Sequence, residues 1–173
     1  MIRAAAIRTV LAAAAATGLT PAPAAGREDL GIYGRWGAFR DPAARRCHAI
    51  ARPVRPAPPA GRAMPDQPYA SIGFWPGRQP GGQLHLRLSR AHGGAAGPVL
   101  SVGGRRFALI ARGVDAWAAD QRMDAAIIAA LRSAEQMTIS GRTAGGVGFA
   151  DHYALRGAAS AIDAAMIGCA VRR

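Results

Sequence analysis

The feature that most constrains this chain is its pair of cysteines, Cys47 and Cys169, which lie far apart in a sequence of 173 residues. Two cysteines allow only one intrachain disulfide, which would tie an early segment to the C-terminal segment. The chain-entropy model assigns so long a loop a stabilisation of roughly 4–5 kcal/mol. We predict this disulfide, provided that the chain reaches an oxidising compartment. Two free buried thiols or one reactive thiol are the alternatives.

The N-terminal residues have the features of an export signal. Arginines at the start precede an apolar run over residues 9–19, and residues 22–24 (Ala-Pro-Ala) fit the small-residue rule for cleavage. The apolar run is too short to remain in a bilayer as a spanning helix. We therefore predict a signal peptide over residues 1–24. The mature chain, residues 25–173, is predicted to be a single periplasmic or secreted domain with no transmembrane segment.

The positive charge of the chain has two explanations, a codon bias that favours arginine and alanine, or an anionic partner, and by itself it is weak evidence for the partner. The net charge is +12, and all 22 basic residues are arginine. These arginines are scattered singly or in pairs, which argues against a nucleic-acid partner. An exported basic protein is better matched to an anionic envelope surface, such as lipid headgroups or acidic polysaccharide. We predict either such a surface or an envelope protein as the partner.

Most of the mature chain has the alternating pattern of short antiparallel strands. The clearest example is residues 83–89 (QLHLRLS), where every second residue is leucine. Other strands are predicted at residues 32–39, 46–51, 69–75, 98–102, 105–111 and 137–142, and within 145–155. Gly103-Gly104 suits a two-residue primed turn. The pattern predicts a mainly β fold, an antiparallel β-sandwich or open barrel of seven or eight strands.

Two segments change to the helical period. Asp120 can cap a mid-chain helix over residues 121–135, and an alanine-rich C-terminal helix is predicted over residues 157–169. Residues 52–68 contain six prolines, which exclude a helix or a central strand. We expect an exposed, extended loop there.

Five short motifs share an order that is typical of one family. They are residues 33–39 (YGRWGAF), 46–50 (RCHAI), 71–76 (SIGFWP), 130–134 (ALRSA) and 151–157 (DHYALRG). Over nearly all of the mature chain this order resembles the invasion-associated locus B family of exported α-proteobacterial proteins. The resemblance implies a β-sandwich-like fold, an envelope location and no established catalytic activity. Unlike many members, the chain has no cysteine before Cys47, so it looks like a short divergent branch.

The candidate recognition surface consists of Trp75, Arg78, His85 and Arg87. A tryptophan at the turn that follows a strand, beside an arginine, is a good recognition spot. His85 and Arg87 alternate with leucines and are expected on the solvent side of their strand. We predict a non-catalytic binding protein with no cofactor and no metal ion.

The alternative function is that of a periplasmic enzyme with Cys47 as its nucleophile. His48 cannot activate Cys47, because neighbouring residues of a strand point to opposite faces. The general base would have to be His85 or His152, brought close by the fold. No local nucleophile motif surrounds Cys47, and for this reason we favour binding over catalysis.

Overall fold

In the computed structural model of the chain, residues 26–54, 67–77 and 81–170 are described. The strands are β1 (Glu28–Tyr33), β2 (Trp36–Asp41), β3 (Arg46–Ala51), β4 (Tyr69–Phe74), β5 (Gln83–Arg87), β6 (Val99–Val102), β7 (Arg105–Ala108), β8 (Ile110–Arg112), β9 (Asp115–Trp117), β10 (Gln136–Arg142) and β11 (Gly148–Ala154). The helices are α1 (Gln121–Ser133) and α2 (Ala158–Ala170). The predicted signal peptide, most of the proline-rich segment and Arg78 lie outside the described residues.

The strands form two open antiparallel sheets. The large sheet has seven strands in the order β1-β2-β3-β4-β5-β9-β8, and the small sheet has four in the order β11-β10-β6-β7. The mainly β fold with one mid-chain and one C-terminal helix is confirmed. The described residues contain eleven strands, however, rather than seven or eight. The predicted strand 32–39 is divided by a turn into the end of β1 and most of β2. The rest of edge strand β1 escapes the sequence pattern because half of its residues are exposed. Residues 105–111 divide between β7 and β8, which belong to different sheets.

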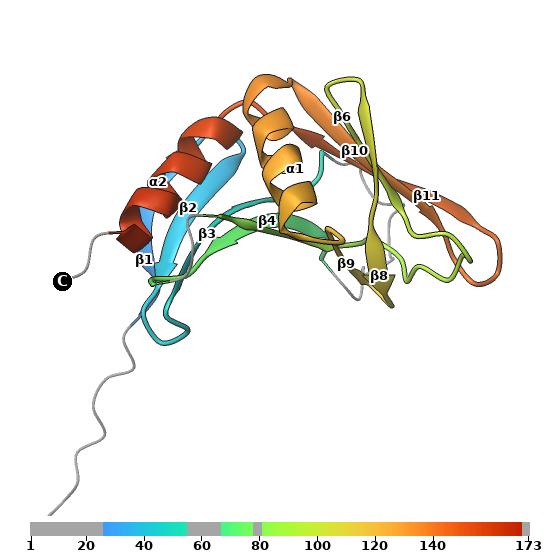
Figure 1. The fold of residues 1–173 in the computed structure, drawn as a ribbon, viewed down its shortest axis with the longest axis horizontal. Helices are drawn as coiled ribbons and strands as arrows, with labels where there is room; N and C mark the ends of the chain where they lie inside the picture. Colours follow the sequence, from blue (N-terminus) through green and yellow to red (C-terminus); the bar gives the residue numbers. More distant parts are fainter. Residues whose placement is uncertain (1–25, 55–66, 78–80, 171–173) are drawn as a thin grey trace, which may run out of the picture.

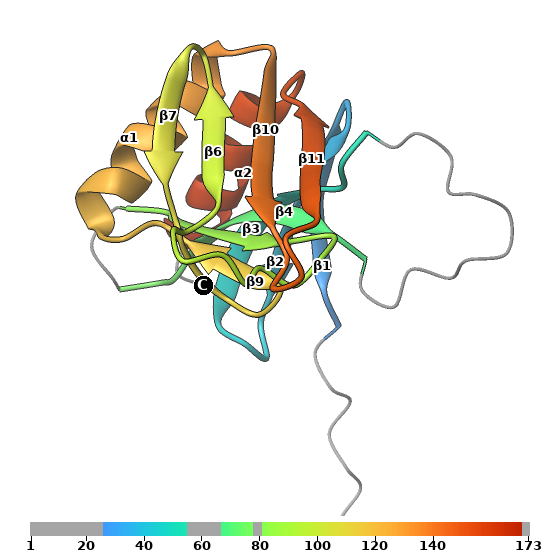
Figure 2. The ribbon, with the colours of Figure 1, turned by 90° about the vertical axis from the view of Figure 1, so that its right-hand side faces the viewer.

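Both helices lie on one side of the large sheet (Figure 1). Helix α2 contacts β1, β2, β3 and β4, and α1 contacts β5. Figure 2 shows the four strands of the small sheet standing upright beside one another on that same side. The core lies between these layers. We call the opposite side of the large sheet its outer face; no helix or strand of the described residues covers it.

Local sequence signals explain how the elements that surround the core begin and end. Leu84 and Leu86 are fully buried, as the alternation of β5 predicts. The side chain of Asp120 accepts a hydrogen bond of 2.7 Å from the Met123 N–H and caps α1, which confirms the predicted cap. Gly103 and Gly104 join β6 to β7 with positive φ at both positions, which the primed turn requires.

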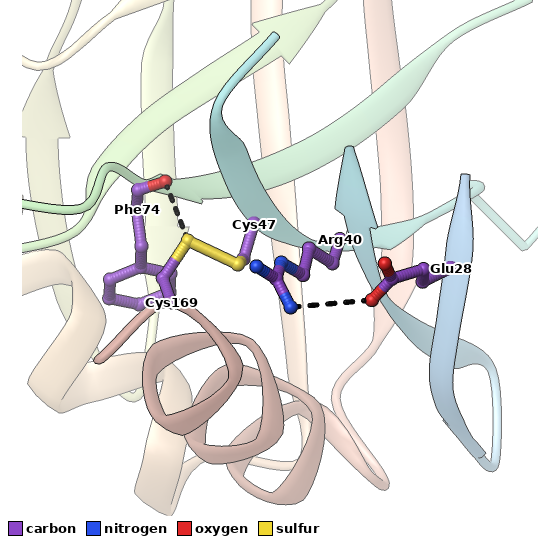
Figure 3. Close-up of a disulfide and its surroundings, with 5 residues drawn as sticks. All are labelled: Glu28, Arg40, Cys47, Phe74 and Cys169. Atoms are coloured by element: carbon purple, nitrogen blue, oxygen red, sulfur yellow. Dashed lines mark hydrogen bonds and ion pairs between the residues drawn. A yellow bond between two sulfur atoms is a disulfide. The ribbon is translucent and has the colours of Figure 1, made fainter. Parts of the chain in front are cut away.

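A disulfide between Cys47 and Cys169 joins β3 to α2, so the predicted pairing is confirmed (Figure 3). The two Cα atoms are 5.6 Å apart, although 122 residues separate them in the sequence. Both cysteines are buried, and the Phe74 carbonyl oxygen lies 3.5 Å from the Cys169 sulfur. The bond therefore holds the last helix against the middle of the large sheet. Neither helix of the described residues has the length and apolar character needed to cross a bilayer.

Candidate functional site

The outer face of the large sheet carries the residues that the sequence selects for recognition. His85 and Arg87 lie on β5 at positions that alternate with buried leucines, so both side chains are on the outer face. Trp75 follows β4, and its ring lies over Gly73 so closely that an added β-carbon there would collide with it. Three of the four predicted residues therefore share one face. The fourth, Arg78, is outside the described residues.

His85 is the centre of a hydrogen-bonded cluster on this face. Its Nε2 atom is 2.9 Å from Asp115 Oδ1, and its Nδ1 atom is 3.4 Å from the Tyr69 hydroxyl oxygen. Its ring stacks on Trp117 with centroids 5.6 Å apart, and Arg87 also lies 3.5 Å from Asp115 Oδ1. Because both nitrogens of His85 have partners, the cluster is a fixed polar platform rather than a set of free side chains.

The sequence alone does not reveal Tyr69, Asp115 and Trp117 as members of this cluster. Asp115 and Trp117 lie on β9, whose three residues are too few to show an alternating pattern. Strand β9 pairs with β5, which places Asp115 opposite Arg87 and Trp117 opposite His85. Tyr69 faces Arg87 from β4, on the other side of β5. The cluster therefore follows from strand pairing, which single-strand patterns do not contain.

A pocket of about 470 Å³ opens on the outer face beside this cluster. Its described lining includes Arg27, Arg35 and Arg52, and no carboxylate. The Arg27 guanidinium carbon lies 5.6 Å from the centre of the Phe39 ring. Tyr69 belongs both to this pocket and to the His85 cluster, so the two features are continuous. A basic rim around a partly aromatic floor suits an anionic ligand.

His48 lies next to this basic edge and is only 3% exposed. Its ring is 5.8 Å from the Phe39 ring, and its Nδ1 atom has no hydrogen-bond partner among the described residues. Burial lowers the pKa of His48 to about 4, the positive charges of Arg46 and Arg27 add to this effect, and Asp41 opposes it. His48 is therefore neutral at physiological pH.

A second pocket, of about 440 Å³, lies between the start of α1 and the β4–β5 connection. Trp75, Asp120 and Asp124 are among its lining residues. Both carboxylates have structural roles, because Asp120 caps α1 and Asp124 Oδ1 accepts a hydrogen bond of 2.8 Å from the Leu84 N–H. Burial raises the pKa of Asp124, and the hydrogen bond from Leu84 opposes this shift. The arginine-lined pocket is the stronger binding candidate, since its charged groups have no such structural role.

The residues that the catalytic alternative needs do not come together in this structure. Cys47 is bonded to Cys169 on the core side of the large sheet, whereas His85 lies on the outer face. His152 is exposed on β11 of the small sheet, where its Nδ1 atom is 3.0 Å from Thr138 Oγ1. In the disulfide, Cys47 has no thiolate that could act as a nucleophile. The catalytic alternative therefore requires reduction of the disulfide and a rearrangement that brings a histidine to Cys47.

Comparison with family models, curated proteins and solved structures gives no match to this chain. The resemblance to the invasion-associated locus B family thus remains a prediction that rests on the motifs themselves. Within the described ranges, no group of three or more His, Cys, Asp or Glu side chains is placed to hold a metal ion.

Proposed function

We propose that this chain is an exported, non-catalytic accessory protein of the cell envelope, of the invasion-associated locus B type. We propose further that it binds an envelope protein or an anionic surface through the outer face of its large sheet. The observation that carries the proposal is the uncovered outer face with its polar cluster and its arginine-lined pocket. Side chains held by one another on a rigid sheet are suited to recognition, since little order is lost on binding.

Separate features of the sequence and of the structure support the proposed location of the protein in the cell envelope. The N-terminal residues have the pattern of an export signal, and the order of motifs resembles a family of exported proteins. The Cys47–Cys169 disulfide fits an oxidising compartment, because disulfides of this kind seldom persist in the cytosol. It also removes the free thiol that an enzyme based on Cys47 needs.

A pair of matched substitutions tests whether the outer face is the binding surface. Ile110 lies on the outer face opposite Trp117 and is 54% exposed, while Val147, in the β10–β11 turn, is 57% exposed. We expect Ile110→Asp to lower association of the exported protein with the envelope fraction by about tenfold, because it places a negative charge in the binding surface. Val147→Asp changes a comparable exposed aliphatic residue and should have little effect.

Three results would refute the proposal. The first is protein that stays in the cytosol with residues 1–24 still attached, which intact mass would reveal. The second is exported protein that does not associate with the envelope. The third is an equal loss of association in Ile110→Asp and Val147→Asp, which would place binding elsewhere. Labelling of Cys47 by a thiol reagent in unreduced protein would instead support the catalytic alternative.

A further inference from the structure

The arginine-lined pocket has a definite place at one end of the outer face. Arg27 precedes β1, Arg35 lies in the β1–β2 turn, and Arg52 follows β3. Arg35 and Arg52 lie at the same end of the sheet, because Trp36 pairs with Ala51, whereas Arg27 lies at the other end of β1. The side chain of Arg27 reaches the same pocket over the Phe39 ring. The pocket therefore extends along the first strands of the sheet, and its three arginines come from 26 positions of the sequence, from 27 to 52.

The described part of the chain leaves these arginines without an ion pair. Glu28 pairs with Arg40 on the other side of the sheet, beside Cys47 (Figure 3), and Asp115 is shared by His85 and Arg87 on the far side of Tyr69. Asp29 and Asp41 accept hydrogen bonds from the N–H groups of Gly31 and Ala44. No ion pair joins Arg27, Arg35 or Arg52 to a carboxylate of the described ranges. Burial is the main cause of the lowered pKa of His48, and the positive charges of Arg46 and Arg27 add to it against the charge of Asp41.

The same pocket also has apolar lining residues between its arginines. Ile32, Phe39, Ile50 and Tyr69 belong to its lining, and Ile32 is 63% exposed. Gly37 lies between these side chains, and a β-carbon at Gly37 would collide with the Phe39 ring and press against the δ-methyl group of Ile32. Glycine thus lets large apolar side chains lie flat over β2. An exposed isoleucine in an arginine-lined surface is typical of a protein that inserts shallowly among acidic lipid headgroups.

We propose that this pocket docks the protein onto an anionic lipid surface, with acidic headgroups along its arginines Arg27, Arg35 and Arg52 and with Ile32 at the acyl boundary. This lipid assignment rests on the proposed function, because it identifies the anionic surface proposed there as a lipid surface. Charge complementarity favours an anion, because the described lining holds three guanidinium groups and no carboxylate. The exposed Ile32 favours lipid over a purely polar partner, since a polysaccharide offers no apolar layer to cover it.

The test uses exported protein whose N-terminus has been checked by mass, mixed with vesicles and measured by co-sedimentation. Vesicles of about one-third phosphatidylglycerol in phosphatidylcholine are compared with phosphatidylcholine alone at about 0.1 M salt. The site triple R27Q/R35Q/R52Q is compared with the control triple R90Q/R106Q/R122Q, which removes the same charge from exposed arginines outside the pocket. We expect about fivefold weaker binding per pocket arginine, hence roughly 100-fold for the site triple. The control triple should weaken binding much less.

A second variant keeps the test independent of any effect of the triple on folding. Ile32 is exposed, so Ile32→Ser should leave the melting temperature nearly unchanged and weaken binding to the acidic vesicles roughly fivefold. Val147→Ser is its control. These losses, together with weak binding to phosphatidylcholine alone, would support the assignment. The proposed function is refuted if the protein stays in the cytosol with residues 1–24 attached. In that case the same variants are compared in the full chain, because residues 1–24 are then identical in all of them.

Several results would overturn the lipid assignment while leaving the proposed function intact. Equal losses in the two triples would mean attraction by diffuse net charge rather than by the pocket. Envelope association without binding to the acidic vesicles would point to a protein partner. Binding to soluble polyglutamate as tight as binding to the vesicles, with the same loss in the site triple and none in Ile32→Ser, would make the pocket a site for acidic protein segments.

Discussion

Removal of the disulfide is the perturbation whose effect can be worked out most directly. The bond closes a loop with a sequence separation of 122 residues, for which the chain-entropy model gives a stabilisation of about 5 kcal/mol. Removal of a native disulfide from a small secreted domain lowers the free energy of unfolding by about 2–5 kcal/mol. We therefore expect C47A/C169A to lose about 3–5 kcal/mol of unfolding free energy. Alanine avoids placing a hydroxyl group in the buried site.

The assay is urea unfolding at pH 7, followed by tryptophan fluorescence, for both proteins with and without reductant. A loss of this size should also lower the melting temperature by roughly 10 °C in a domain of this length. Reductant should bring the wild type close to the variant and leave the variant unchanged. A loss below about 1 kcal/mol would refute the reasoning, because it would mean that the loop constraint contributes little to stability.

Three further predictions concern single positions. Asp124→Ala should lower the free energy of unfolding by about 1–3 kcal/mol, because it leaves the buried Leu84 N–H without an acceptor. Asp124→Asn keeps the accepting oxygen and should lower it less. Urea unfolding compares the two variants, and equal losses would contradict the role of the hydrogen bond. The pKa of His48 is lowered from 6.5 to about 4 in the folded state, so the unfolded chain takes up its proton first and stability falls as the pH drops from 6.5 towards 4, by up to about 3 kcal/mol. His48→Phe should remove that part of the pH dependence of unfolding, and an identical pH profile in the variant would disprove it. Gly157 and Gly146 both have positive φ, of 91° and 78°, but a β-carbon at Gly157 would overlap the Tyr33 carbonyl oxygen, whereas the space at Gly146 is open. Gly157→Ala should therefore lower the melting temperature more than Gly146→Ala. Equal shifts would mean that backbone strain alone determines the loss of stability.

The local elements of this fold could be predicted because each depends on neighbours in the sequence. The alternation of Leu84 and Leu86 with polar residues fixes the buried side of β5, and Asp120 marks the start of α1. The pairing of Cys47 with Cys169 also follows from the sequence, since only one connectivity exists. Edge strand β1 and the three-residue strand β9 could not be found in this way, because exposed or very short strands lack a pattern of burial.

The candidate site depends on contacts that no local pattern contains. The sequence determines that His85 and Arg87 point away from the core, because strand geometry alternates the two faces. Only the tertiary structure decides that Asp115 lies beside both of them, because β9 pairs with β5 across about 30 residues of chain. It also decides that Arg27, Arg35 and Arg52 line one pocket, since β1, β2 and β3 lie side by side beneath it. Residue types and faces are thus set by the sequence, whereas which charges become neighbours is set by the order of strands in the sheet.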